Sequence, residues 1–252
     1  PGCRTAPAAG GIHPTRESLA YAVGLLDWGD PERLGQAEEV LRRVIGLQDQ
    51  DPESRTYGIW PRFLEEPLSR MSPPDGSWAD VCAVHLLQAA LDHGGRFAPD
   101  LQALVKGSIL HAAASIRRRD TGPAATGIAL LGTHVTLVAG EAFGMEDLRS
   151  YGAARLKRFF DFLRENGSFE EFSSPTGTIA AIETVSRMLR QVRDPEARRR
   201  LEALDRFAWK HAARRFHPPT AQWAGPQSLS CGTLLGTEAL AFLQRASGGA
   251  LG

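Results

Sequence analysis

The sequence predicts an all-α protein, and more narrowly an incomplete α/α toroid of about four to five helical hairpins. From His13 onward apolar residues recur at helical spacing, and no segment shows a convincing strand pattern. Helices that are apolar around their circumference alternate with helices that carry arginine-rich faces. The first kind must be surrounded by protein and the second must face water, as in the inner and outer layers of a toroid. A plain helical bundle is the alternative architecture.

Nine helices are expected from the pattern of apolar residues. Pro14 and Thr15 form the entry to the first, and Pro31 after Asp30 supplies the first-turn proline of the second. The later helices are delimited by their apolar periodicity between loops rich in Pro and Gly. The expected ranges are Ser18–Asp27, Pro31–Asp49, Ser77–His93, Pro99–Arg118, Pro123–Phe143, Met145–Glu165, Thr178–Gln191, Pro195–Arg215 and Thr233–Arg245.

The connections between these helices alternate in length, and the alternation predicts the hairpins. Short turns join helices one to two, three to four, five to six and seven to eight, which indicates antiparallel neighbours. The joins between hairpins are longer or richer in reactive side chains, and all of them are expected at one end of the fold. They run from Gln50 to Gly76, from Arg117 to Gly122, from Gly167 to Thr178 and from Phe216 to Gly232.

The start of the chain has a different composition from the rest. Residues 1–11 are rich in Pro, Ala and Gly without periodicity, so we expect a disordered arm or an expression remnant there. Residues 12–252 are expected to form a single domain, because 42% apolar residues suffice to bury a core. The chain begins at Pro1 without a Met. We expect a cytoplasmic protein if Pro1 is near the native start, and a secreted or periplasmic one if a signal peptide was removed.

Composition limits the kinds of partner. Lys and Arg together number 29, as do Asp and Glu, so no net field attracts nucleic acid or an acidic membrane surface. No apolar run reaches the length of a membrane span. The three cysteines form neither a disulfide framework nor a CxxC pair, and no standard metal motif is present. We expect a small-molecule or oligosaccharide ligand, no nucleic acid, no membrane, no cofactor and no bound metal; the oligomeric state is left open.

The loop over residues 168–178 has the composition of a functional loop. It places two adjacent carboxylates, Glu170 and Glu171, between phenylalanines and follows them with hydroxyls that include Thr176. Loops on rigid helical scaffolds commonly carry function. The structural alternative is a plain turn between two helices, with Thr178 as N-cap of the second.

Polar residues on the expected inner helices form a second group of candidates. His134 lies among apolar or small neighbours, and Glu141, seven residues later, shares its face. Burial of a titratable group requires a partner, and several such groups around one central axis indicate a site. The structural alternative for each is a core side chain hydrogen-bonded to a neighbouring helix. The other members are Asp80, His85, Gln88 and the pair Glu183 and Arg187.

The long loops add aromatic side chains, an amide and a guanidinium. They are Tyr57, Trp60, Arg62 and Trp78 around the first long connection, and His217, Trp223 and Gln227 in the last. Sugar rings have apolar faces and polar edges, so this combination favours carbohydrate recognition. The tryptophans could equally be lids that close the helical core.

Several short motifs lie in these same segments. They are YGIWP with a following EEP, PPDGSWAD, GTHVTLVAGE, FEEFSSPT, and FHPPT with QWAGP, over roughly residues 12–230. Together they resemble the motif series of bacterial toroid proteins similar to the heparinase and alginate-lyase class of polysaccharide lyases. The resemblance implies an α/α toroid and β-elimination at a uronic acid. There, a base removes the proton next to the carboxylate, an acid protonates the leaving oxygen, and neutral or cationic donors stabilise the enolate-like intermediate.

The chain departs from that family pattern at several expected catalytic positions. Gly177 stands where the pattern has a Tyr, and Gln227 stands where it has a His. Ala125 and Gly127 occupy the positions of an expected Tyr and Asn. The loss of bulky side chains would enlarge the cavity, which suits a different and more apolar ligand.

The first functional hypothesis is a lyase-like enzyme that acts on a uronate-containing sugar or related small acid. His134 would be the general base and Tyr57 the general acid. Two alternatives stay open. One is a repurposed cyclase or isomerase, in which Glu170 and Glu171 do acid–base work inside an apolar cup, and the other is a non-catalytic glycan-binding protein. The expected substrate-binding residues are Trp60, Arg62, Trp78, Asp80, His85, Thr176, His217, Trp223 and Gln227.

Overall fold

A computed structural model describes residues 11–170, 174–227 and 235–249. In these residues nine α-helices dominate, and the only strands are a two-residue antiparallel pair, so the predicted all-α fold class is confirmed. The helices are α1 (Thr15–Trp28), α2 (Pro31–Ile45), α3 (Trp78–His93), α4 (Pro99–Arg119), α5 (Thr126–Ala142), α6 (Glu146–Asn166), α7 (Pro175–Gln191), α8 (Pro195–Ala213) and α9 (Thr237–Ala246). The short elements are η1 (Leu68–Arg70), η2 (Gly94–Arg96), η3 (Pro218–Thr220), β1 (Phe216–His217) and β2 (Gln222–Trp223).

The start of α7 differs from the prediction. The helix begins at Pro175, three positions before the expected Thr178, because Ser174 is the N-cap and its hydroxyl accepts a hydrogen bond from Gly177 N at 3.0 Å. Thr178 lies inside the helix and its hydroxyl donates to Ser174 O at 2.8 Å. The prediction of Thr178 as N-cap was therefore wrong. A first-turn proline is compatible with this helix start because proline has no N–H to leave unsatisfied.

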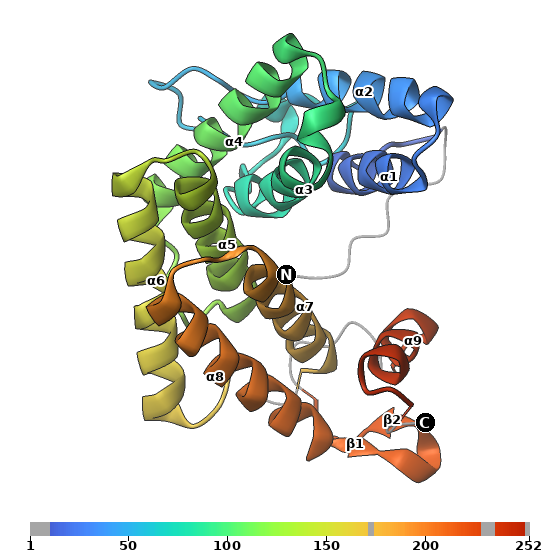
Figure 1. Ribbon diagram of the computed structural model, residues 1–252, viewed down its shortest axis with the longest axis vertical. Helices are drawn as coiled ribbons and strands as arrows, with labels where there is room; N and C mark the ends of the chain where they lie inside the picture. Colours follow the sequence, from blue (N-terminus) through green and yellow to red (C-terminus); the bar gives the residue numbers. More distant parts are fainter. Residues whose placement is uncertain (1–10, 171–173, 228–234, 250–252) are drawn as a thin grey trace. The chain divides into compact units, whose positions relative to one another are not determined.

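The described chain divides into two compact units (Figure 1). The N-terminal unit contains residues 11–121 and 131–152, and the C-terminal unit contains residues 122–130 together with the described residues from 153 onward. The expected single domain and its closure into a toroid depend on how the two units are arranged, so both stay predictions. Residues 1–10, the bulk of the expected disordered arm, lie outside the described residues.

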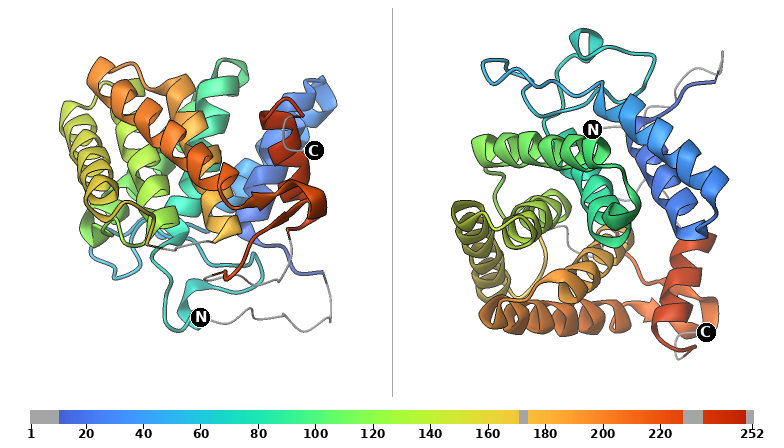
Figure 2. Two further views of the ribbon diagram at one scale, coloured as in Figure 1. Left: turned by 90° about the horizontal axis from the view of Figure 1, so that it is seen from below. Right: turned by 45° about the horizontal axis from the view of Figure 1, so that its top comes forward.

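The N-terminal unit is built on two helical hairpins. Helix α1 packs against α2 and α3, and α4 packs against α3 and α2, as Figures 1 and 2 show. Leu19, Leu41, Leu86 and Ile109, one from each helix, are fully buried between them. Burial of these apolar side chains holds the four helices together.

The parts of α5 and α6 that belong to this unit approach each other through glycines. A Cβ atom at Gly152 would lie 2.4 Å from Leu137 N, and one at Gly140 would lie 2.3 Å from Arg149 N. No side chain fits at such distances, so both positions require glycine. This contact supports the expected α5–α6 hairpin.

The segment of residues 46–77 between α2 and α3 has little regular structure, but it is well anchored. Gly58 adopts a positive φ of 78°, and a Cβ there would lie 2.3 Å from the carbonyl oxygen of His111. Trp60 is 0% exposed and its indole N–H donates to Val44 O at 3.0 Å. Trp60 is therefore a core side chain, and its predicted role as a substrate ligand is corrected: no face of its ring reaches the surface.

The C-terminal unit is built on the hairpin of α7 and α8, which pack together as predicted (Figure 1). Asp194 caps α8 by accepting a hydrogen bond from Ala197 N at 2.7 Å. Beyond α8, the β1–β2 pair turns the chain back through η3. The amide of Leu235 then donates to the side chain of Gln222 at 2.7 Å, which ties the start of the last described segment to β2.

Candidate functional site

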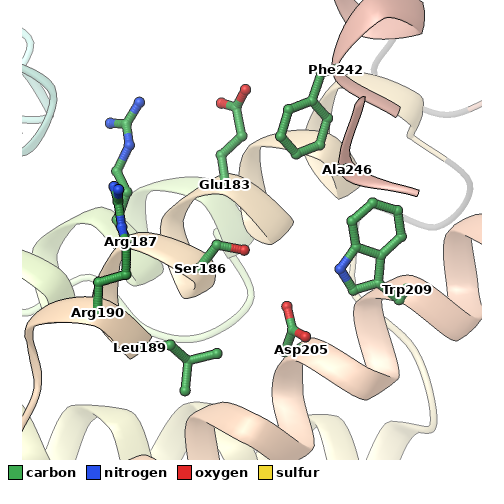
Figure 3. A pocket seen from close by; sticks show the side chains of 9 residues that line it. All are labelled: Glu183, Ser186, Arg187, Leu189, Arg190, Asp205, Trp209, Phe242 and Ala246. Atoms are coloured by element: carbon green, nitrogen blue, oxygen red, sulfur yellow. The ribbon is translucent and has the colours of Figure 1, made fainter. Parts of the chain in front are cut away.

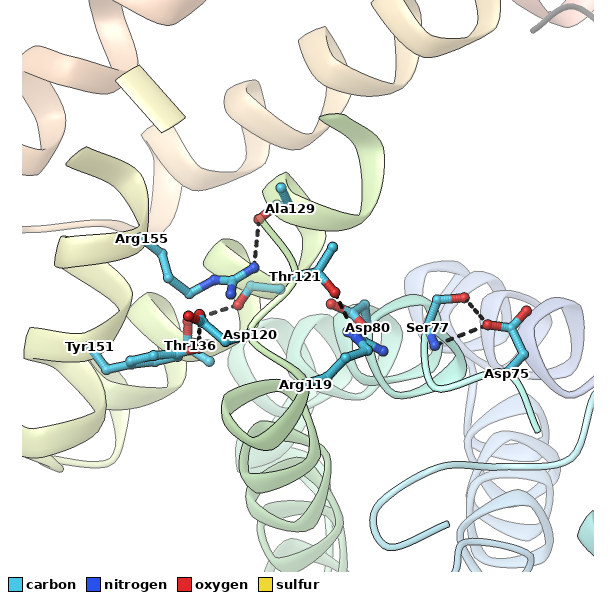
Figure 4. Close-up of polar contacts among 11 residues, drawn as sticks. Asp75, Ser77, Asp80, Arg119, Asp120, Thr121, Ala129, Thr136, Tyr151 and Arg155 are labelled. Carbon is cyan, nitrogen blue, oxygen red and sulfur yellow. Dashed lines mark hydrogen bonds and ion pairs between the residues drawn. The ribbon is translucent and has the colours of Figure 1, made fainter. Parts of the chain in front are cut away.

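Five side chains gather around the first turn of α3 in the N-terminal unit. They are Arg62, Asp75, Trp78, Asp80 and Arg119, and we call them the α3 cluster. Three of them, Arg62, Trp78 and Asp80, were predicted from the sequence to bind substrate. Figure 4 shows Asp80 beside Arg119, and Asp75 bonded to Ser77, at this helix end.

Asp75 orients the guanidinium of Arg62. Its Oδ2 accepts from Arg62 Nη2 at 2.9 Å, and its Oδ1 accepts from both the amide and the hydroxyl of Ser77, at 3.1 and 2.5 Å. Burial raises the pKa of Asp75, but the hydrogen bonds from Ser77 and Arg62 outweigh burial and lower the pKa below its ordinary value. The carboxylate therefore stays charged near neutral pH and keeps Arg62 in place.

Trp78 supports the same guanidinium from its ring face. The Arg62 carbon Cζ lies 5.4 Å from the centroid of the Trp78 ring, a cation–π distance. The indole N–H donates at 2.7 Å to the hydroxyl of Thr15, a fully buried residue that donates in turn to Pro61 O at 2.7 Å. This chain of hydrogen bonds holds the tryptophan ring in one orientation.

Asp80 and Arg119 form the second ion pair of the cluster. Asp80 is fully buried, whereas the Arg119 side chain is 27% exposed, and its Nη2 pairs with Asp80 Oδ2. Arg119 Nε also donates to the hydroxyl of Thr121 at 2.8 Å. A Cβ at Gly76 would lie 3.2 Å from Arg119 Nη1, so the glycine lets the guanidinium approach the backbone at the helix start. The two ion pairs thus flank the same turn.

Two hydrogen-bond donors of the cluster have no acceptor among the described residues. Within the described residues, Arg62 Nε and Arg119 Nη1 are buried atoms that donate to no acceptor. They lie at the N-terminus of a 16-residue helix, where the helix dipole also favours negative charge. An anionic group such as a carboxylate is the ligand type that this arrangement would hold.

A hydrogen-bonded pair joins the segment between α2 and α3 to α4, the helix that carries Arg119. The hydroxyl of Tyr57 is 2.8 Å from Nδ1 of His111 on α4, and the two rings meet edge to face. Both residues are half-buried, and Arg118 stacks 5.4 Å from the centroid of the Tyr57 ring. His111 precedes Arg119 by eight positions, about 12 Å along the helix axis at 1.5 Å per residue. A ligand longer than one sugar ring would be needed to touch both groups.

The predicted residues on inner helices have different degrees of exposure. His134 on α5 is 2% exposed, and His85 on α3 is half-buried. Glu141, the predicted partner of His134, is also half-buried. Their pairing and the role of His134 as general base stay predictions.

The predicted acidic loop lies in the C-terminal unit. Phe169 is buried and meets the rings of Phe207 and His211 edge to face, at centroid distances of 5.4 and 5.6 Å. Glu170, the next residue, is exposed. In this structure it does not face a desolvated pocket, because the anchored Phe169 side chain takes the buried position. Glu171 lies outside the described residues.

The remaining predicted ligands of this unit make local contacts. Thr176 is exposed at the second position of α7, and His217 is exposed with its Nδ1 2.8 Å from the hydroxyl of Thr220. Trp223 is only 4% exposed, which corrects its prediction as a ligand plate and favours the structural alternative of a lid. Gln227 donates from its side chain to Trp223 O at 3.5 Å.

His211 makes the stability of this unit depend on pH. Burial, together with the positive charges of Arg215 and Arg214, lowers the pKa of His211 to about 4. Arg215 Nη1 can only donate, so His211 Nδ1 accepts at 3.1 Å, a hydrogen bond that protonation would abolish. The unfolded chain therefore binds a proton more readily than the folded one between pH 6.5 and 4. We expect stability to fall as the pH is lowered through this window, by up to about 3 kcal/mol.

Urea unfolding at pH 7 and pH 4.5, followed by circular dichroism, measures this effect. His211→Phe should flatten the acid loss, because no group is left to protonate. His217→Phe is the matched control, since His217 is exposed and the variant should keep the parental pH dependence. Asp205, on the same helix, acts in the opposite direction because burial raises its pKa. A parent protein equally stable at both pH values, with a flat profile in Asp205→Asn as well, would contradict the assignment.

Several residues of these sites were not predicted from the sequence. Asp75 and Arg119 were overlooked because an acidic turn residue and the last arginine of a charged run resemble ordinary surface features. The only available signal was their position at helix ends. His111 gave no signal, since a lone histidine on a polar helix is common.

The fold defines an all-α protein, and its α3 cluster holds two ion pairs and two guanidinium N–H groups without an acceptor in the described residues. The chain belongs to the family described as "Domain of unknown function (DUF8769)", whose profile matches residues 3–236. No curated protein and no solved structure shows significant similarity to the chain. In the described part of the chain, no helix is long and apolar enough to cross a membrane. Nor do the described residues contain a group of three or more His, Cys, Asp or Glu side chains that could hold a metal ion.

Proposed function

We propose that the protein is a lyase-like enzyme that binds a uronate-containing sugar at the α3 cluster and cleaves it by β-elimination. The observation that carries this proposal is the pair of buried guanidinium donors without acceptors, Arg62 Nε and Arg119 Nη1, at the start of α3. A uronate carboxylate would accept hydrogen bonds from these donors. Once bound there, its negative charge is neutralised, which makes the adjacent carbon-bound proton easier to remove.

Tyr57 and His111 supply proton transfer in this proposal. A phenol hydrogen-bonded to an imidazole at 2.8 Å can give a proton to a leaving glycosidic oxygen and recover it through the imidazole. Their offset of about 12 Å from Arg119 along α4 favours an oligosaccharide over a single sugar. The predicted base His134 belongs to the same unit, and its part in the reaction is an expectation of the resemblance.

Tyr57→Phe tests the catalytic step. The variant keeps the ring that packs on His111 and loses only the hydroxyl, so we expect kcat to fall about 100-fold or more with little change in KM. Arg62→Gln should instead weaken substrate binding about tenfold or more, because a charged hydrogen bond to the carboxylate is lost. The measurement is the ultraviolet absorbance of unsaturated uronate products formed from acidic oligosaccharides of defined length.

Two matched controls separate these effects from nonspecific effects of removing a tyrosine hydroxyl or an arginine charge. Tyr21→Phe removes the hydroxyl of a tyrosine that is 59% exposed on α1, and Arg70→Gln removes an exposed arginine of the same connecting segment as Arg62. Both should behave like the parent. If the parent binds acidic oligosaccharides without forming unsaturated product, the protein is a glycan-binding protein and the lyase proposal fails. If no acidic oligosaccharide binds, the carboxylate site itself is wrong.

A further inference from the structure

A separate pocket of about 570 Å³ opens on the C-terminal unit between α7, α8 and α9 (Figure 3). Its volume falls within the range of about 300–1,000 Å³ that is common for small-molecule sites. None of its residues belongs to the α3 cluster, and two of them, Glu183 and Arg187, were candidates on the expected inner helices in the sequence analysis. Figure 3 shows side chains from α7 on one side and Asp205 and Trp209 from α8 on the facing side.

One wall of the pocket is aromatic. The rings of Trp209 and Phe242 stack at a centroid distance of 6.3 Å and an angle of 14°. Both side chains are half-buried, so part of each remains accessible beside the pocket. A flat apolar ring is the ligand group that would extend this stack.

Two carboxyl groups line the pocket and have unused acceptor capacity. Asp205 Oδ1 is buried and accepts no hydrogen bond within the described residues. Burial raises the pKa of Asp205, and the neighbouring Arg206 only partly opposes the shift. Glu183, across the pocket on α7, is half-buried and makes no ion pair among the residues that the structure describes. A positively charged N–H group of a ligand would satisfy Asp205 Oδ1, with Glu183 as a further acidic group of the pocket.

Two guanidinium groups line the same pocket without a counter-ion. Arg187 and Arg190 on α7 form no ion pair in the described part of the chain, although Glu183 lies one turn from Arg187. Elsewhere, arginines do pair with acids: Arg42 binds Asp100 at 2.6 Å. Charges of both signs therefore line the pocket, and Figure 3 shows the two arginines on the side away from the aromatic wall.

We propose that this pocket binds a small zwitterionic molecule with an aromatic ring, of which a free aromatic amino acid is the simplest case. The ring packs against Trp209 and Phe242. The ammonium group donates to Asp205, with Glu183 as the second carboxylate, and the ligand carboxylate accepts from Arg187 and Arg190. In the absence of a ligand, the charged side chains of the pocket form no ion pair in the described residues, and the two aromatic rings stack only on each other.

The test titrates the full chain with L-phenylalanine in a calorimeter, beside three analogues that each lack one group. 3-Phenylpropionate lacks the ammonium group, 2-phenylethylamine lacks the carboxylate, and L-alanine lacks the ring. We expect L-phenylalanine to bind about tenfold or more tightly than each analogue, because charge-assisted hydrogen bonds and ring burial all contribute. This comparison uses only the parent protein, so it does not depend on the folding of any variant.

Two substitutions assign the groups. Asp205→Asn should weaken L-phenylalanine and 2-phenylethylamine and leave 3-phenylpropionate unchanged. Arg187→Gln should weaken L-phenylalanine and 3-phenylpropionate and leave 2-phenylethylamine unchanged. Arg199→Gln is the matched control, since Arg199 is exposed on α8 and does not line the pocket. The proposal is overturned if L-phenylalanine binds no better than L-alanine, or if both pocket variants keep the parental affinity for every ligand.

Discussion

Arg119→Leu is expected to destabilise the protein by about 3–5 kcal/mol at neutral pH, whereas Asp80→Asn should cost clearly less. The difference follows from the exposure of the group that each substitution leaves behind. Asp80 is fully buried, so removing Arg119 leaves its carboxylate in the protein interior without its guanidinium partner. The Arg119 side chain is 27% exposed, so after removal of Asp80 it can turn towards water and recover much of its hydration.

Denaturant unfolding of the two single variants and of the double variant Asp80→Asn/Arg119→Leu measures this asymmetry. The double variant should regain most of the loss of Arg119→Leu, because the buried carboxylate charge has been removed as well. The loss in Arg119→Leu should also shrink on acidification, since a protonated carboxyl is far less costly to bury. Equal losses in the two single variants would show that the pair is stabilised by its geometry and not by the burial of Asp80.

Gly152→Ala is expected to lower stability by about 3 kcal/mol or more, which corresponds to a fall in Tm of roughly 6–12 °C for a chain of this size. The added Cβ would lie 2.4 Å from Leu137 N and 2.5 Å from Leu137 Cα. These are backbone atoms inside a helix, so no rotamer change relieves the clash, and α5 and α6 must move apart at this point. Gly140→Ala should act in the same way through Arg149 N.

Gly107→Ala provides the control for an ordinary helix glycine. Gly107 lies within α4, and a Cβ there would meet nothing within 4 Å. Alanine is favoured over glycine in a helix by up to about 1 kcal/mol, so this variant should be slightly more stable than the parent. If the Tm of Gly152→Ala lies within about 2 °C of the parental Tm, the loss of stability is below about 1 kcal/mol. The two helices would then separate at little cost.

The helices and the class of fold could be predicted from the sequence because their signals are local. Apolar spacing and first-turn prolines depend on residues three or four positions apart, and they located α2, α4 and α8 at their true starts. The boundary of α7 was predicted less accurately. Ser174 and Thr178 are four residues apart and both are good N-cap residues, so the sequence does not choose between them. The path of the preceding loop makes Ser174 the cap.

The candidate site could be predicted only in part. Arg62, Trp78 and Asp80 were chosen from the sequence, and the structure brings them together at the start of α3. Trp60 and Trp223 were chosen, like Trp78, because aromatic rings bind the apolar faces of sugars, but both are core side chains. An exposed and a buried tryptophan look alike in a loop sequence, because burial depends on which distant helix the loop crosses.

The sequence by itself determined the helical class, the hairpins and the segments that carry reactive side chains, since each of these follows from neighbours along the chain. Tertiary structure alone decided which charges meet. The pairing of Asp80 with Arg119 joins residues 39 positions apart, and that of Tyr57 with His111 joins residues 54 apart. Whether a charged side chain is neutralised by the fold, as Asp75 is, or forms no ion pair in the described residues, as is the case for Arg187, depends on distances of a few ångströms between helices. Coulombic and hydrogen-bond energies fall steeply over such distances, and no local pattern in the sequence records them.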